Sequence, residues 1–233
     1  FLKNNDLIQL VFEPLIIFGS VITMIGGSLL AVIQSSVKKM LAASSVVHSC
    51  YLMIALAAIE DADSSSSSAI IFYLFAYFIS AIGAFGVLSY ISKGTDKLIS
   101  FDDLNGLGKN NPIIAVSLTI FMLSLAGFPS TIGFIGKFYI FTSAIESGYT
   151  ILALFGAITA FISIYYYFKV IVHLYFKDCS YVKVQYGYRV SLAFIIIAAF
   201  IVLWGGVGTS LILNIPGINE LNELSKYAIQ SLG

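Results

Sequence analysis

Charged residues and cysteines are scarce in this sequence, and each scarcity argues against a class of protein. Only 10% of the 233 residues are charged, and twelve acidic side chains balance twelve basic ones. The chain therefore offers no basic surface for nucleic acid and no acidic tail. Its two cysteines, Cys50 and Cys179, form no CxxC motif and no ligand cluster, which argues against a disulfide framework, an iron–sulfur cluster and a zinc site.

Motifs for the common redox cofactors are also missing. The sequence has no glycine-rich nucleotide fingerprint, no metal-ligand cluster and no haem motif. We therefore expect no cofactor in this chain and no freestanding redox enzyme. The sequence begins with Phe1 rather than Met, so we expect a product that is processed, truncated or incompletely covered.

Hydrophobic residues are abundant and gather in long runs. They make up 59% of the chain, the mean hydropathy is +0.96, and uncharged runs are long enough to cross a hydrocarbon core of roughly 30 Å. We predict an all-α, polytopic integral membrane protein that forms a single transmembrane domain over residues 1–233. About seven transmembrane helices are expected, at 15–33, 40–59, 70–91, 112–127, 132–144, 149–176 and 190–213.

Two local features of these spans affect how they pack. Only a few residues separate the fourth span from the fifth, so we expect these two to form a tight hairpin. In the third span, Tyr73, Tyr77, Ser80 and Ala84 recur at helical spacing, which indicates a small, partly polar face for helix packing.

One lysine stands out because it is the only charged residue between Pro112 and Ile145, namely Lys137. An ionised lysine at the centre of a bilayer costs at least ~3 kcal/mol, so such residues usually face a bundle interior or water and serve ion pathways. The surrounding glycines, Gly133 and Gly136, permit close approach of a backbone, water or a polar partner. The alternative is a lysine that extends from a helix end to the headgroups.

The residues just before Lys137 predict a break in the helix. Gly127 and Pro129 interrupt the apolar run, and we expect Gly133 and Gly136 to contribute to the break. A broken helix inside a membrane is tolerated where protein or an aqueous cavity satisfies the freed backbone groups.

A second lysine, Lys38, lies between two apolar spans with little room for a solvated loop. If Lys38 belongs to the following helix, Ser45 lies near its azimuth, and His48 is about 15 Å further along the axis and roughly 80° round. Waters or other side chains must then lie between Lys38 and His48. The alternatives are a lysine pair with Lys39 at an interfacial helix start, and a hydrogen-bonded core histidine.

The sixth span carries a polar stripe. Thr159, Ser163, Tyr166, Lys169 and His173 lie within an arc of about 120° on one helix, which indicates a possible polar path along the membrane. Alternatively, Lys169 and His173 approach the headgroups beside an aromatic belt. Burial disfavours the charged form of a lysine, so a buried lysine can take up and release a proton when a neighbouring charge changes.

Four stretches of the sequence resemble a known family. QSSVKKMLAASSVVHSCYLM from Gln34 resembles the K-R/K-x-L-A-Y-S-S-x-x-H-x-G-Y stretch of the antiporter-like subunits of respiratory complex I. YFISAIGAFG, FDDLNGLGKNNP and LSLAGFPSTIGFIGKFYIF follow in the family's order and spacing. Within the family, the chain is most similar to the subunit 2 type of NADH:ubiquinone oxidoreductase, called the N-type in bacteria. Ala43 and Cys50 depart from the family's usual tyrosine and glycine.

The resemblance implies a membrane-arm subunit that translocates protons while NADH:ubiquinone electron transfer proceeds elsewhere in the complex. It places the family's middle lysine at Lys38, its distal lysine at Lys137, on a broken helix, and its motif histidine at His48. The implied partners are the other membrane-arm subunits and lipid. A multi-subunit cation/proton antiporter and a packing-only membrane subunit are the alternatives.

The family typically has about fourteen helices in two inverted repeats, and this chain matches the second repeat. We therefore expect a split subunit whose first-half helices come from a partner chain, with an incompletely covered longer chain as the competing explanation. A split subunit would favour the mitochondrial inner membrane, with a bacterial plasma membrane as the alternative.

Overall fold

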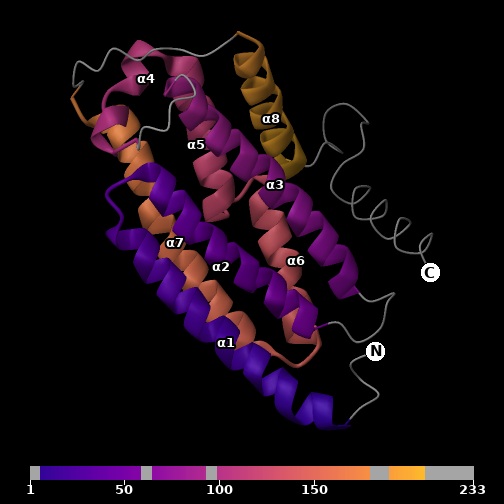
Figure 1. Ribbon diagram of the computed structural model, residues 1–233. Helices are drawn as coiled ribbons and strands as arrows, with labels where there is room; N and C mark the ends of the chain where they lie inside the picture. The colour runs from indigo at the N-terminus through magenta and orange to yellow at the C-terminus, as the bar shows by residue number, and fades with distance from the viewer. Residues whose placement is uncertain (1–5, 59–64, 93–98, 179–188, 208–233) are drawn as a thin grey trace, which may run out of the picture.

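The computed structural model describes residues 6–58, 65–92, 99–178 and 189–207, and their regular structure is helical (Figure 1). Ser36 and Ser100 add one isolated β-bridge. Cys179, the end of the seventh predicted span and everything after it lie outside the described residues. The elements are α1 (Asp6–Ile33), α2 (Val37–Ala57), α3 (Ser65–Ile91), η2 (Asp102–Leu104), α4 (Leu107–Asn110), α5 (Pro112–Ala126), α6 (Ile132–Glu146), α7 (Thr150–Phe176) and α8 (Arg189–Val207).

The prediction of an all-α membrane protein is confirmed, and each of the seven predicted spans corresponds to one helix. In the described part of the chain, five helices are long and apolar enough to cross a membrane alone: α1, α2, α3, α7 and α8. α5 and α6 have fifteen residues each, or about 22 Å, which is too short for a full crossing. Within the described residues, the number of complete crossings is therefore smaller than seven.

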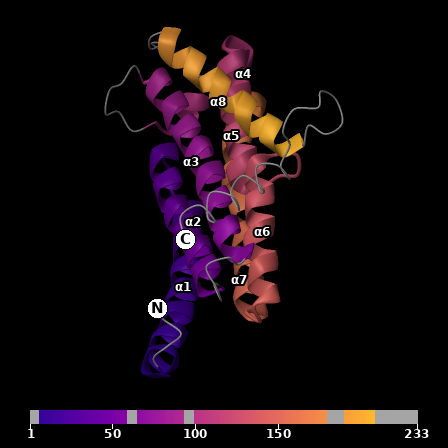
Figure 2. The same cartoon turned by 90° about the vertical axis from the view of Figure 1, so that its right-hand side faces the viewer.

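The expectation that α5 and α6 form a hairpin is wrong. The two helices follow one another along the bundle, α5 in one half and α6 in the other (Figures 1 and 2). The long helices α3 and α7 pack against both. Residues 127–131 therefore form a break between two half-length helices. Phe128, Pro129 and Ser130 of this break are exposed, whereas Thr131 is buried.

Helix boundaries differ from the predicted ones mainly at polar ends. α1 begins at Asp6, before the predicted start at Leu15, and α2 begins at Val37, so Lys38 belongs to its first turn. In lipid, backbone polar groups must be satisfied within the segment, which favours continuing a helix through polar flanking residues.

The centre of the bundle is rich in tyrosine. The largest fully buried side chains include Tyr51, Tyr73, Tyr166 and Tyr167, and they come from α2, α3 and α7. Many large apolar side chains on the outside are exposed, such as Phe18, Phe78 and Phe161, as a lipid-facing surface requires. The polar interior therefore lies within an apolar shell, next to the break between α5 and α6.

Candidate functional site

The end of α5 leaves two carbonyl groups free at the helix break. Gly127 adopts a left-handed conformation with φ 81°, and its N–H donates to the carbonyls of Leu123 and Ser124, both at 3.0 Å. The N–H of Phe128 also donates to Leu123, at 2.9 Å. This is the usual glycine-terminated helix end. It leaves the carbonyls of Leu125 and Ala126 without partners on the helix.

Lys137 supplies those partners. Its Nζ donates to the carbonyl of Leu125 at 2.8 Å and to that of Ala126 at 3.1 Å, and the residue is only 5% exposed. The carboxyl end of a helix carries partial negative charge, so it favours a cation placed there. Both partners are neutral carbonyls, so the amine has no carboxylate in this contact to hold it in the charged form.

Two donated hydrogen bonds suit both forms of the Lys137 amine. A neutral amine has two N–H groups and a lone pair, and an ammonium has three N–H groups. The two bonds to the α5 carbonyls can persist in either form, and the third position of Nζ can gain or lose a proton. The two hydrogen bonds that hold the Lys137 amine are therefore compatible with repeated uptake and release of a proton.

A small polar cavity adjoins Lys137. It leaves about 10 Å³ for the centre of a water molecule, which is close to the least that one buried water needs. Four hydroxyl-bearing side chains line it, so a water there would have hydrogen-bond partners. The lining residues are His48, Tyr73, Ala76, Tyr77, Ser80, Ser124, Leu125, Gly133 and Lys137.

His48 also lines this cavity and is 2% exposed. Its Nδ1 is 2.5 Å from the hydroxyl of Tyr73 and its Nε2 is 3.1 Å from that of Tyr167. The ring stacks on Tyr77, with centroids 4.7 Å apart and planes 27° apart. The Tyr51 ring meets His48 edge-on, and Lys137 Nζ lies 5.4 Å from the centroid of that same ring. Tyr51 therefore contacts both residues.

Gly133 and Gly136 lie inside α6 and do not break it, contrary to the sequence prediction. A Cβ at Gly133 would collide with the carbonyl of Ser124, and one at Gly136 would lie 3.0 Å from the Tyr73 ring. These glycines bring α6 close to α5 and α3, so that Lys137 can reach the α5 carbonyls. Gly127 and Pro129 lie in the break itself, between α5 and α6.

Lys38 lies apart from the cavity. It is in the first turn of α2, partly exposed, and is not among the lining residues. Ser45, which lies near its azimuth, donates its hydroxyl to the carbonyl of Ala42 at 2.7 Å. The structure therefore brings His48 and Lys137 to one site and leaves Lys38 near one end of the same helix.

The polar stripe on α7 divides into a buried part and an end part. Thr159 is hydrogen-bonded to Tyr51, at 3.3 Å between the hydroxyl oxygens. Ser163 donates to its own helix at Ala160, at 2.6 Å. The buried hydroxyl of Tyr166 has no hydrogen-bond partner among the described residues. The stripe thus reaches the core, but its side chains form no continuous chain of hydrogen bonds among the described residues.

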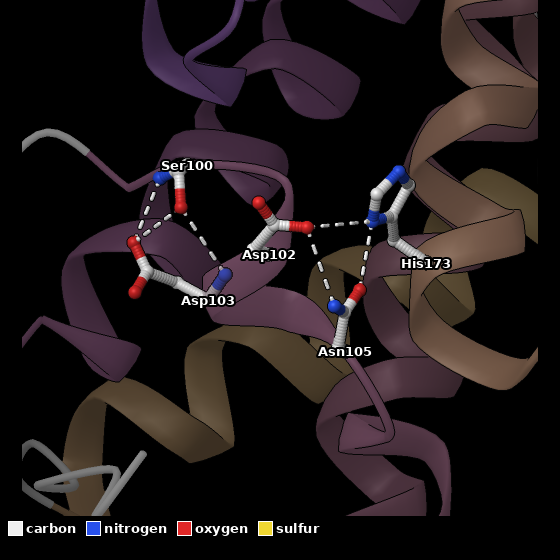
Figure 3. A network of polar contacts seen from close by, with 5 residues as sticks. All are labelled: Ser100, Asp102, Asp103, Asn105 and His173. Atoms are coloured by element: carbon white, nitrogen blue, oxygen red, sulfur yellow. Dashed lines mark hydrogen bonds and ion pairs between the residues drawn. The ribbon is translucent and has the colours of Figure 1, made fainter. Parts of the chain in front are cut away.

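The end part of the stripe binds the segment that precedes α4. His173 Nδ1 is 2.7 Å from Asn105 Oδ1 and 3.9 Å from Asp102 Oδ1 (Figure 3), and Lys169 Nζ lies 4.2 Å from the centroid of the Phe101 ring. Asp103 closes a local turn with Ser100, as Figure 3 also shows. Lys169 and His173 are therefore occupied at the end of α7, away from Lys137.

Two members of the site, Tyr167 and Ser124, are not among the residues predicted from the sequence. Tyr73 is predicted there only as part of a packing face. The helical spacing of Tyr73, Tyr77 and Ser80 is the signal that points to this site, because a polar face on a membrane helix must meet polar partners. Within the described residues, no three His, Cys, Asp or Glu side chains gather where they could hold a metal ion.

Residues 5–163 match the family described as NADH:quinone oxidoreductase/Mrp antiporter, TM. The chain belongs to this family. It is 45% identical over 161 residues to NADH-quinone oxidoreductase subunit N of Bdellovibrio bacteriovorus, a match that covers 68% of this chain and 33% of that protein. It is 40% identical over 179 residues to subunit N 2 of Chloroherpeton thalassium, covering 75% and 34%. The chain spans about a third of the length of these relatives.

Solved structures of this family have the same fold. A chain of respiratory complex I from Thermus thermophilus with bound aureothin superposes with a TM-score of 0.73 at 26% identity, covering 83% of this chain and 43% of that one. A chain of the Mrp complex from Dietzia gives a TM-score of 0.77 at 18% identity, covering 95% and 49%. The resemblance to the antiporter-like subunits of complex I is thus confirmed. These relatives are bacterial, and they give no support to a mitochondrial location or a split subunit.

Proposed function

We propose that this chain is part of the membrane arm of a bacterial NADH–quinone oxidoreductase and that it moves protons through Lys137. The observation that carries the proposal is the Lys137 amine, 5% exposed and held by two neutral carbonyls beside a polar cavity. The sequence relatives, named as subunit N of that enzyme, support the choice of complex. The chain then resides in the plasma membrane, in contact with other membrane-arm subunits and lipid.

In this proposal the chain handles protons and other subunits handle electrons. Lys137 takes up a proton on the third position of Nζ and releases it when a neighbouring charge changes. The α5 carbonyls hold the amine in place throughout. His48 exchanges protons with Lys137 across the cavity. Lys38, partly exposed at the start of α2, exchanges protons with water, and waters or side chains that lie between Lys38 and His48 carry these protons to and from the histidine.

The test is Lys137→Gln in the intact complex, because a glutamine amide can still donate to a carbonyl but cannot take up a proton at neutral pH. Membrane vesicles are assayed for NADH oxidation and for NADH-driven acidification, and the assembled complex is measured on native gels. We expect normal assembly and a loss of acidification. Lys39→Gln, at an exposed lysine, is the matched control. An assembled Lys137→Gln complex that pumps like the Lys39→Gln complex would overturn the proposal and support a packing role.

A cation/proton antiporter subunit is the second candidate, because the family description includes the Mrp antiporters. Its test is the composition of the native complex after gentle detergent extraction. Quinone-reductase activity that copurifies with this chain supports the first proposal. Copurification with antiporter subunits and no quinone reduction supports the second.

A further inference from the structure

His48 is bonded to tyrosine at both ring nitrogens. Tyr73 of α3 reaches Nδ1 at 2.5 Å, and Tyr167 of α7 reaches Nε2 at 3.1 Å. A neutral imidazole has one N–H donor and one acceptor nitrogen. One tyrosine must therefore donate to the ring while the other accepts from it. When His48 changes to its other tautomer, the tyrosine hydroxyl that donated to the ring accepts from it, and the one that accepted donates.

The tyrosine on the Nδ1 side also faces the cavity. Tyr73, His48 and Lys137 line the same space, which has room for about one water. His48 forms hydrogen bonds with the two tyrosines, and Lys137 forms its own with the α5 carbonyls. Since Nδ1 is occupied by Tyr73, a proton that passes between Lys137 and this nitrogen must go through the Tyr73 hydroxyl.

We propose that Tyr73 and Tyr167 are proton-relay residues on the two sides of His48, with Tyr73 on the side of Lys137. This inference rests on the proposed function, since it concerns the path of the same protons. The Tyr73 hydroxyl receives a proton from the cavity side and gives its own to Nδ1. The resulting imidazolium releases its Nε2 proton to the Tyr167 hydroxyl, which passes its own proton toward Lys38, the residue proposed above to exchange protons with water. No tyrosinate accumulates, because each hydroxyl gains one proton as it loses another.

The first test is Tyr73→Phe in the intact complex, assayed in membrane vesicles. Phenylalanine keeps the ring that packs on Gly136 and removes only the hydroxyl. Tyr165→Phe is the matched control, since Tyr165 lies on α7 two residues before Tyr167, is 63% exposed and does not line the cavity. General acid–base groups contribute about a hundredfold or more, so we expect NADH-driven acidification to slow at least ~10-fold in Tyr73→Phe and to stay near wild type in Tyr165→Phe.

A double variant separates a relay from a structural support. If Tyr73 acts only through His48, Tyr73→Phe should cause no further loss of NADH-driven acidification in a His48→Gln background. A packing defect should instead cause an additional loss in that background. Tyr167→Phe is the second single variant and should behave like Tyr73→Phe. It keeps the inference testable if Tyr73→Phe does not assemble.

Two outcomes would overturn the relay. One is an assembled Tyr73→Phe or Tyr167→Phe complex that pumps like Tyr165→Phe, and the other is a full additional loss in the double variant. Lys137→Gln, measured beside them, distinguishes this failure from that of the proposed function. If Lys137→Gln stops acidification and the tyrosine variants do not, the relay is wrong and the function of Lys137 stands. If none of them changes acidification, both are wrong.

Discussion

The side chain of Lys137 lies against the backbone of Gly127, at the turn that ends α5. A Cβ at residue 127 would lie 3.0 Å from Lys137 Cδ and 3.4 Å from Nζ. Gly127 also has a φ of 81°, a left-handed conformation that costs other residues about 1–2 kcal/mol. This glycine therefore both ends the helix and leaves room for the lysine that binds the helix end.

The first prediction concerns Gly127→Ala. The substitution should strain the turn and push Lys137 from the α5 carbonyls, so we expect a lower thermal stability of the complex and slower NADH-driven acidification. Gly148→Ala is the matched control, because Gly148 has a φ of 85° with nothing within 4 Å of its Cβ position. It should show the backbone strain alone. Equal effects of the two variants on acidification would contradict a role for the contact between Gly127 and Lys137.

The second prediction concerns the close approach of α6 to α5. A Cβ at Gly133 would collide with the Ser124 carbonyl, which belongs to backbone and cannot rotate away. We expect Gly133→Ala to reduce the amount of assembled complex on native gels. Gly19→Ala, in α1 with nothing within 4 Å of its Cβ position, should assemble normally and gain up to ~1 kcal/mol of helix stability. Normal assembly and thermal stability of Gly133→Ala would show that α6 can move away from α5 without loss.

The lysine at the centre of the site could be predicted from sequence, but its partners could not. Lys137 stands out because it is the only charge in a long apolar run, and the cost of burying it implies a polar site. Its partners are the carbonyls of Leu125 and Ala126. Every residue has a backbone carbonyl, so no sequence pattern marks these two. They lack partners on the helix only because Gly127 ends α5 in a left-handed conformation. The sequence also does not specify the direction in which α6 continues after the break, and the short connection by itself favours a hairpin.

Helical periodicity gave the azimuth of residues but neither their depth nor their partners. Thr159 and His173 do lie on one face of α7, yet Thr159 is buried against Tyr51 and His173 binds Asn105 at the end of the helix. The partners of His48 lie 25 and 119 residues away in sequence. Such pairs are set by tertiary packing, and a local pattern cannot specify them.

The third prediction concerns the contacts that hold residues 99–106 against the end of α7. His173→Ala removes the hydrogen bond to Asn105 and the contact with the Phe101 ring. A hydrogen bond of this kind contributes about 1 kcal/mol, so amide hydrogen exchange in residues 99–106 should speed up about fivefold. The measurement is exchange with mass spectrometry on the solubilised complex.

Lys177→Ala is the control for this experiment, because Lys177 is an exposed residue just after α7. It should leave exchange in residues 99–106 unchanged. Unchanged exchange in His173→Ala as well would mean that the backbone bond from Gly106 N–H to the His173 carbonyl, 3.2 Å long, is enough to hold this segment. That result would show that the His173 imidazole does not stabilise the position of this segment.

The last prediction separates the charge of Lys137 from its ability to exchange a proton. Arginine keeps a positive charge and N–H donors for the α5 carbonyls, but its guanidinium does not lose a proton in proteins. We therefore expect Lys137→Arg to assemble and oxidise NADH but to lose acidification, as Lys137→Gln does. Lys39→Arg, at an exposed position, should behave as wild type. If Lys137→Arg pumps at the wild-type rate while Lys137→Gln does not, residue 137 serves as a fixed positive charge, and the moving proton must be carried by His48 and the tyrosines around it.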